Sequence, residues 1–201
     1  MKTIILASAS PRRKELLEKI DLIFEVDASD CEEDINPGLE SRLKPLEIVR
    51  KLSIKKAQSV AARHKNAIII AADTIGMVGD KILGKPHTKN EASKMLRAIS
   101  GKSHSVITGF SILDTATNKI VTETVNTQVY IKKLTGEEID AYVKTGEPLD
   151  KAGAYAIQGM GAVIVKKIEG DFYNVMGLPL NALTEALKEF GINIWGKNPP
   201  R

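Results

Sequence analysis

The sequence predicts an α/β fold, and three observations in its first third carry that prediction. A short apolar strand after Thr3 runs directly into a helix over 11–20, and a second short strand follows over 22–26. A long amphipathic helix over 46–64 then leads into 67–72, an unbroken apolar run of strand length. Such runs are typical of the central strands of α/β sheets, which are buried on both faces. The 201 residues suffice for one sizeable core or for two lobes sharing one sheet, and we favour a single domain.

The first strand ends in a serine-rich turn with the features of an anion site. Ser10 suits the N-cap and Pro11 the first helical position, so the helix is predicted to begin there. The first turn carries Arg12 and Arg13. Their positive charge has the same sign as the amino end of the helix dipole, and this repulsion costs about 0.3–1 kcal/mol for each arginine. A phosphate bound by backbone N–H groups, the Ser8 and Ser10 hydroxyls and both guanidinium groups would offset this cost. The alternative is that both arginines face solvent.

Composition and charge exclude several classes of protein. The net charge of +4 is mild and spread along the chain, so binding to duplex nucleic acid is not implied. Cys31 is the single cysteine, which excludes an intrachain disulfide framework and fits a reducing compartment. The apolar run near the start is too short for a secretory signal, and no stretch approaches the ~18 apolar residues of a membrane span. We therefore expect a cytoplasmic protein without a membrane partner or a stable nucleic-acid partner.

An acidic stretch over 27–34 stands out in this net basic chain. A solvated loop is the common explanation of such a charge run. The sharper hypothesis is that one carboxylate, for which we select Glu33, helps to hold a hard cation beside the serine-rich turn.

The helix predicted over 46–64 places a lysine on its apolar stripe. Val49, Leu52, Lys56 and Val60 are spaced three or four residues apart and so share one face. Lys56 therefore either snorkels to the edge of the core or aims its ammonium group at a bound anion, and we favour the second interpretation.

The apolar run over 67–72 ends in an acid. Asp73 lies near the carboxyl end of a core strand, and open α/β sheets bind ligands at that edge. An aspartate at a strand end ordinarily forms a turn. Thr74-Ile75 continues the strand instead, which favours a catalytic role for Asp73.

A hairpin predicted over 77–83, with Gly79-Asp80 at its tip, returns the chain to the same region. Lys85 follows it and is held extended by Pro86. A lysine fixed beside a phosphate would be useful there, although a solvent-exposed lysine is the usual case.

The remaining elements form the rest of the architecture. Capping boxes at Thr88/Glu91 and Thr135/Glu138 predict helices that end near Ile99 and Gly146. We also expect strands over 105–113 and 119–132 joined by a turn over 114–118, a strand over 162–168, a turn over 169–171 leading to 172–176, a last helix from about Pro179 to Phe190, and a loose tail over 196–201.

A second concentrated signal lies in Asp150-Lys-Ala-Gly-Ala-Tyr-Ala-Ile-Gln-Gly-Met-Gly. Its glycines, Gly153, Gly159 and Gly161, permit close approach of the backbone to a ligand, although glycines also make bulges. The Gln158 amide offers a donor and an acceptor together, the pattern needed to recognise a planar base edge.

Five motifs in this order resemble the Maf family of nucleoside triphosphate pyrophosphatases, once named septum formation inhibitors. They are Leu6-Ala-Ser-Ala-Ser-Pro-Arg-Arg, Ala72-Asp-Thr, Gly84-Lys-Pro, Asp150-Lys-Ala-Gly-Ala-Tyr-Ala-Ile-Gln-Gly and Gly177-Leu-Pro-Leu. The resemblance covers about residues 3–190. It implies a Maf/ITPase-like α/β fold, in which a long twisted mixed sheet carries two lobes around a central cleft. We expect one such domain over 1–195, followed by a flexible tail over 196–201 that is not part of the family pattern. It also implies a homodimer.

The resemblance implies a role for each matching position. Ser8, Arg13, Lys56 and Lys85 would hold the triphosphate, and Glu33 and Asp73 would organise a divalent metal, with Asp73 accepting the proton of the attacking water. Arg12, Thr74 and Gln158 resemble the specificity positions of the branch that acts on dTTP and UTP. The sister branch, which acts on 7-methyl-GTP, differs around the last two of these positions.

The activity implied is hydrolysis of dTTP and UTP, with modified pyrimidine nucleotides as further candidates, to the monophosphate and pyrophosphate. The metal would be Mg²⁺, with Mn²⁺ and Co²⁺ as alternatives. Another class stays open, a nucleotide- or nucleic-acid-binding regulator of cell division. The acid at Asp73 argues against it, because a pure binder has no need for a base. A phosphatase of another substrate class, which would release orthophosphate, is a weaker option.

Overall fold

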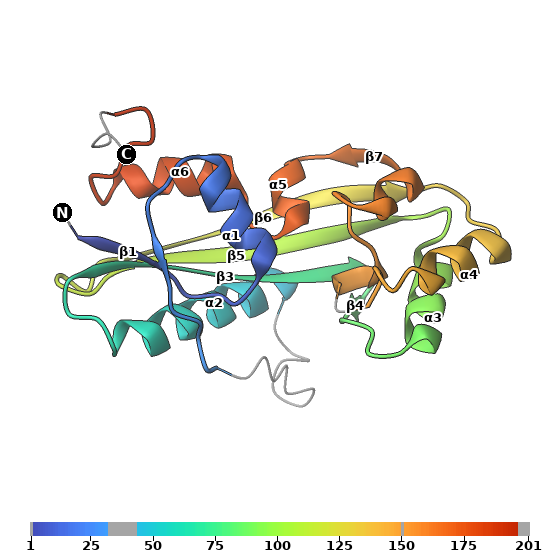
Figure 1. Cartoon of the computed structure of the whole chain (residues 1–201), viewed down its shortest axis with the longest axis horizontal. Helices are drawn as coiled ribbons and strands as arrows, with labels where there is room; N and C mark the ends of the chain where they lie inside the picture. The colour runs from blue at the N-terminus through green and yellow to red at the C-terminus, as the bar shows by residue number, and fades with distance from the viewer. Residues whose placement is uncertain (1, 32–43, 150, 197–201) are drawn as a thin grey trace. The chain divides into compact units, whose positions relative to one another are not determined.

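A computed structural model describes residues 2–31, 44–149 and 151–196, and the predicted α/β class is confirmed (Figure 1). Strands β1 and β2 pair in parallel, as do β1 and β3, whereas β3 with β4 and β6 with β7 are antiparallel, so the sheet is mixed. It has seven strands in the order β2-β1-β3-β5-β6-β7, with β4 attached to β3. Their bounds are β1 Thr3–Leu6, β2 Glu25–Val26, β3 Ala67–Val78, β4 Lys81–Leu83, β5 Ser103–Asp114, β6 Ile120–Ile131 and β7 Val165–Glu169.

The chain divides into two compact units. Unit 1 comprises 1–73, 108–125 and 177–201, and unit 2 comprises 74–107 and 126–176. Each of the long strands β3, β5 and β6 therefore begins in one unit and ends in the other. The central cleft implied by the resemblance stays a prediction.

Unit 1 contains the helices α1 (Pro11–Lys19), α2 (Pro45–Ala61) and α6 (Leu180–Lys188). Figure 1 shows α2 on one side of the strands and α1 with α6 on the other. Side chains from α2, from β1 and the residue after it, from β3 and from β5 form a common core, which comprises Ile5, Ala7, Ala57, Val60, Ala67, Ile69, Ala71 and Leu113. As predicted for a central strand, every residue of β3 from Ala67 to Asp73 is buried.

Unit 2 contains α3 (Lys89–Ile99), α4 (Gly136–Lys144) and α5 (Phe172–Met176). The capping box at Thr135 and Glu138 is confirmed in both directions. At α3 the Thr88 side chain accepts the Glu91 N–H as expected, but the Glu91 carboxylate accepts the N–H of His87 instead of that of Thr88. The predicted hairpin is also confirmed, since Val78 pairs with Lys81 around Gly79-Asp80.

Other boundaries differ from the expectation. The strand predicted over 162–168 begins only at Val165, because Met160–Ile164 forms a 3₁₀ helix, η3, in which Ala162 N–H donates to the Gly159 carbonyl at 3.0 Å. The strand predicted over 22–26 is reduced to β2, and the last helix ends at Lys188. Of the predicted tail, residues 197–201 lie outside the described residues.

Within the described ranges, no helix combines the length and the apolar character needed to cross a membrane.

Candidate functional site

Asp73 and Lys56 meet because the side-chain alternation of β3 and the helical spacing of α2 place both residues on the faces where these two elements pack together. Successive side chains of β3 alternate between faces, so Asp73 shares the face of Ile69 and Ala71, which belong to the core formed with α2. On α2, Lys56 lies one turn before Val60 and beside Ala57, on the stripe that covers this face. Lys56 Nζ donates a hydrogen bond to Asp73 Oδ1 at 2.5 Å.

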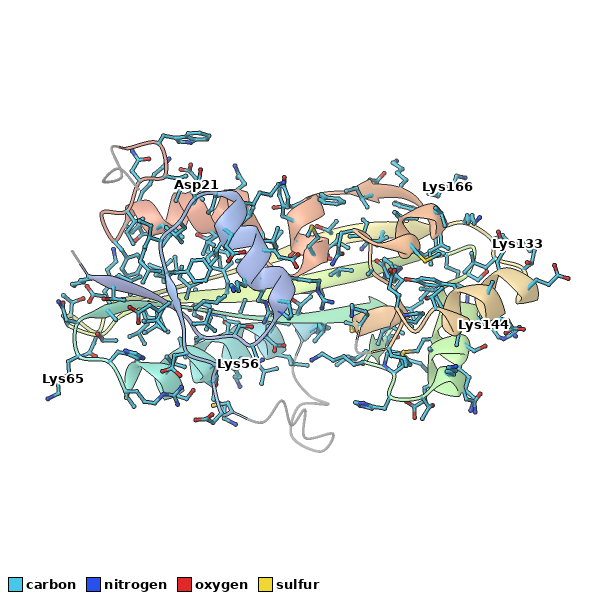
Figure 2. The ribbon with its side chains drawn as sticks, in the orientation of Figure 1. Asp21, Lys56, Lys65, Lys133, Lys144 and Lys166 are labelled. Carbon is cyan, nitrogen blue, oxygen red and sulfur yellow. The ribbon has the colours of Figure 1, made fainter. Side chains whose placement is uncertain are left out.

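The Lys56–Asp73 pair is an almost fully buried ion pair. Both residues are 6% exposed. Lys133, Lys144 and Lys166, by contrast, lie on the surface (Figure 2). Burying a charge is costly unless it is paired and hydrogen-bonded, so the two groups depend on each other. Lys56 therefore does not snorkel to solvent, and its ammonium group is fixed at the carboxylate that the sequence singled out.

The serine-rich turn is held by Arg13, which is buried. Arg13 Nη1 donates to Ser8 Oγ at 3.2 Å, and Ser10 N–H donates to the same oxygen at 3.2 Å. Arg13 Nε donates to the carbonyl of Gly177 at 2.9 Å. The alternative that Arg13 faces solvent is therefore wrong. Through its bond to Gly177, Arg13 links the first of the five motifs to the last.

The start of α1 matches the prediction in position and differs in its capping. Ser10 occupies the N-cap and Pro11 is the first helical residue, but within the described residues the Ser10 side chain makes no capping hydrogen bond. Arg12, in the first turn, is half-buried, and this burial lowers the pKa of its guanidinium group, while Glu15 opposes the shift. Positive charge is thus concentrated at the amino end of α1, where backbone N–H groups also favour an anion.

Three further predicted site residues belong to unit 2. Thr74 follows Asp73 directly on β3 and is half-buried, whereas Lys85 and Gln158 are exposed. The Gly153 N–H donates to the Gly84 carbonyl at 3.2 Å, which joins the glycine-rich motif to the segment carrying Lys85.

Gln158 lies on a tight turn formed by residues 156–159, which we call the Gln158 turn. Gly159 N–H donates to the Ala156 carbonyl at 3.1 Å, the i to i+3 bond of a β-turn. Ile157 is buried in the core of unit 2, whereas Gln158 is exposed. The turn therefore presents the amide outward while its neighbour anchors it.

Glu33 lies outside the described residues, so its predicted metal role is not tested. Among the residues that are described, no cluster of three or more His, Cys, Asp or Glu side chains could hold a metal ion. Mg²⁺ is often bound by only one or two carboxylates together with substrate phosphates. Asp73, a carboxylate at the end of a buried strand segment, fits this mode of binding.

Comparison with known proteins identifies the family. Residues 3–190 match the model of the family described as "Maf-like protein". The chain belongs to the Maf family.

Among its Maf-family relatives, a protein of Methanococcoides burtonii is 52% identical over 196 residues, covering 97% of this chain and 98% of that protein. A protein of Alkaliphilus metalliredigens is 50% identical, covering 96% of this chain and 100% of the relative. A protein of Bacillus anthracis is 49% identical over 194 residues, covering 96% and 98%. All three are named dTTP/UTP pyrophosphatase.

The structure thus assembles the Maf motifs in two groups. Unit 1 joins Ser8 with Arg13 and Lys56 with Asp73, and unit 2 joins the segments of Lys85 and Gln158. The sequence did not predict a role for two groups. These are the Gly177 carbonyl, which accepts a hydrogen bond from Arg13, and the Glu147 carboxylate, which lies beside the Gln158 turn. The first lies within a quoted motif. The second lies shortly after the end of α4 at Lys144 and carries no pattern of its own.

Proposed function

We propose that the protein is a nucleoside triphosphate pyrophosphatase that hydrolyses dTTP and UTP to the nucleoside monophosphate and pyrophosphate. The observation that carries the proposal is the buried pair of Lys56 and Asp73, in which a carboxylate is fixed at 2.5 Å from an ammonium group. The three relatives described above match this chain over nearly their whole length, and all are named dTTP/UTP pyrophosphatase.

Asp73 serves as general base in this proposal. Its carboxylate takes a proton from a water molecule, whose oxygen attacks the α-phosphorus. The bond from the α-phosphorus to the oxygen that bridges to the β-phosphorus breaks, and pyrophosphate leaves with the electron pair. Lys56 holds Asp73 Oδ1, which orients the carboxylate for proton transfer.

Binding of the triphosphate is assigned to cationic and hydroxyl groups. Ser8, Arg13, Lys56 and Lys85 neutralise and position the phosphates, which supplies most of the acceleration in transfers of this kind. The hydrogen bonds from Arg13 to Ser8 and Gly177 support this role, because they hold the guanidinium group in place. Arg12, Thr74 and Gln158 contact the nucleoside and select the pyrimidine.

The divalent metal, Mg²⁺ or alternatively Mn²⁺ or Co²⁺, would be held by Asp73 and Glu33 together with the phosphates. When bound, it supplies charge neutralisation and a more acidic water.

Replacing Asp73 by Asn tests the proposal. We expect D73N to lose turnover of dTTP and UTP while binding of a non-hydrolysable dTTP analogue stays near the wild-type value, because the amide retains an oxygen for Lys56 but cannot accept a proton. Pyrophosphate release and calorimetric titration measure the two quantities. Hydrolysis by D73N at a near-normal rate would place the base elsewhere.

The regulator alternative makes a different prediction, since a regulator would bind nucleotide without releasing pyrophosphate. No observation favours it. Homodimer formation and a cytoplasmic location stay predictions.

A further inference from the structure

The carboxylate of Glu147 gathers three hydrogen bonds in unit 2. Glu147 Oε1 accepts the Tyr142 hydroxyl at 2.7 Å and the Gly161 N–H at 2.9 Å, and Oε2 accepts the Met160 N–H at 2.9 Å. Partial burial raises the pKa of this carboxyl, but these hydrogen bonds outweigh burial and leave the pKa below its usual value.

Glu147 is itself fixed by the end of α4. The Thr145 hydroxyl donates to the Tyr142 carbonyl at 2.7 Å and accepts the Glu147 N–H at 3.1 Å. Gly146 adopts a φ of 80°, which turns the chain out of the helix at this point. The carboxylate therefore follows a helix end that is held by these hydrogen bonds.

These contacts hold the backbone on both sides of Gln158. Met160 and Gly161 follow the Gln158 turn and bond to Glu147, while Ala156, where the turn begins, donates its N–H to the Tyr142 hydroxyl at 3.1 Å. Tyr142 and Glu147 are joined by a hydrogen bond and act together. Tyr142 holds the residue at the start of the Gln158 turn, and Glu147 holds the two residues that follow the turn.

The same contacts explain two glycines of the motif. A Cβ on Gly159 would lie 2.3 Å from Glu147 Oε2, and a Cβ on Gly161 would lie 2.5 Å from the Tyr142 hydroxyl oxygen. Both distances are far below van der Waals contact. The glycines at 159 and 161 thus let the carboxylate and the phenol approach the backbone.

We propose that Glu147 is a positioning residue for nucleotide selection, which with Tyr142 fixes the Gln158 turn so that the amide meets the pyrimidine. This inference rests on the proposed function, in which Gln158 contacts the base. Glu147 acts through the turn and touches neither phosphate nor metal in this scheme.

The substitution Glu147→Gln tests this role, since an amide places a donor where the carboxylate accepts backbone N–H groups. We expect E147Q to lower kcat/KM for dTTP and UTP about tenfold, with a smaller loss for dATP and dGTP, so that pyrimidine preference falls. Tyr142→Phe, which removes only the hydroxyl, should shift the preference in the same direction and serves as the second variant should E147Q fold poorly.

A matched control exists in the same unit. Glu169 on β7 accepts the Tyr130 hydroxyl at 2.7 Å, the same contact at a place outside the Gln158 turn. E169Q and Tyr130→Phe should therefore leave the nucleotide preference unchanged.

The double variant separates positioning from general destabilisation. In a Q158A background, E147Q should cause no further loss of pyrimidine preference, because the group it positions is gone. Additive losses, or equal losses for all four nucleotides in E147Q and Y142F, would overturn the inference and leave the pyrophosphatase activity standing. A wild-type protein that releases pyrophosphate from no nucleotide would overturn the proposed function, and this inference with it.

Discussion

At the scale of single residues, the Lys56–Asp73 pair shows how strongly one buried charge depends on its partner. Replacing Lys56 by Met leaves the Asp73 carboxylate buried without the ammonium group. Removing one member of a buried ion pair costs about 3–5 kcal/mol. We expect this loss in the free energy of unfolding of K56M, measured by chemical denaturation.

Two further variants complete this test. The exposed neighbour Lys55, replaced by Met, should change stability little. The double variant K56M/D73N should recover part of the loss, since it no longer buries an unpaired carboxylate. A double variant as unstable as the sum of the two single variants would contradict the coupling.

The sequence predicts the placement of each member of this pair more directly than their contact. The apolar stripe of α2 places Lys56 on the buried face, and the strand pattern places Asp73 at the end of an apolar run. Their contact depends on how α2 packs on β3, which single-sequence periodicity does not reveal. The hydrogen bond from Arg13 to Gly177 could likewise not be predicted from sequence patterns, because it joins residues 164 positions apart.

At the scale of elements, α2 approaches the sheet very closely at Gly109 on β5. A Cβ there would lie 2.6 Å from the backbone of Val49, so only glycine allows this packing distance. We expect Gly109→Ala to lower the free energy of unfolding by about 1–3 kcal/mol, because helix and strand must separate. It should also reduce turnover, since the same helix carries Lys56.

Gly136→Ala is the control for this substitution. Gly136 is the first residue of α4, and a Cβ there would meet no atom within 4 Å among the described residues. Its variant should unfold at or slightly above the wild-type temperature in a thermal scan. Equal destabilisation by both substitutions would mean that the close packing at Gly109 is not the cause.

The elements also show where sequence patterns mislead. Residues 162–168 have the apolar and β-branched composition of a strand, yet the first three complete η3. The backbone hydrogen bonds of Met160 and Gly161 to Glu147 hold this segment in a 3₁₀ conformation. Tertiary contacts thus override local propensity beside the candidate site, where such conflicts are expected.

At the scale of the whole molecule, a buried histidine that the proposed chemistry does not use makes stability sensitive to acid. His104 is 2% exposed, and its Nε2 lies 2.9 Å from the Tyr155 hydroxyl, while Nδ1 has no hydrogen-bond partner among the described residues. Burial lowers the pKa of His104 from 6.5 to about 4. The folded protein therefore keeps this imidazole neutral at a pH where the unfolded chain has protonated it.

The sign of the effect follows from linkage. Above pH 6.5 the imidazole is neutral in both states and contributes no pH dependence. As the pH falls from 6.5 to about 4, the unfolded chain binds a proton that the folded protein does not, so stability decreases, by about 3 kcal/mol at most. We expect denaturation midpoints of the wild type to fall steadily through this window, whereas His104→Gln, which cannot titrate, should show a flatter profile.

Asp27 titrates in a lower pH range than His104, so its effect on stability is separable from that of His104. Hydrogen bonds from Arg63 and His64 lower the pKa of Asp27 to about 2, so the stabilisation from Asp27 is lost only as the pH falls below 3.8. This loss should be equal in the wild type and in H104Q. Profiles that run parallel between pH 6.5 and 4 would therefore show that His104 is not the group responsible, whatever the absolute stability of the variant.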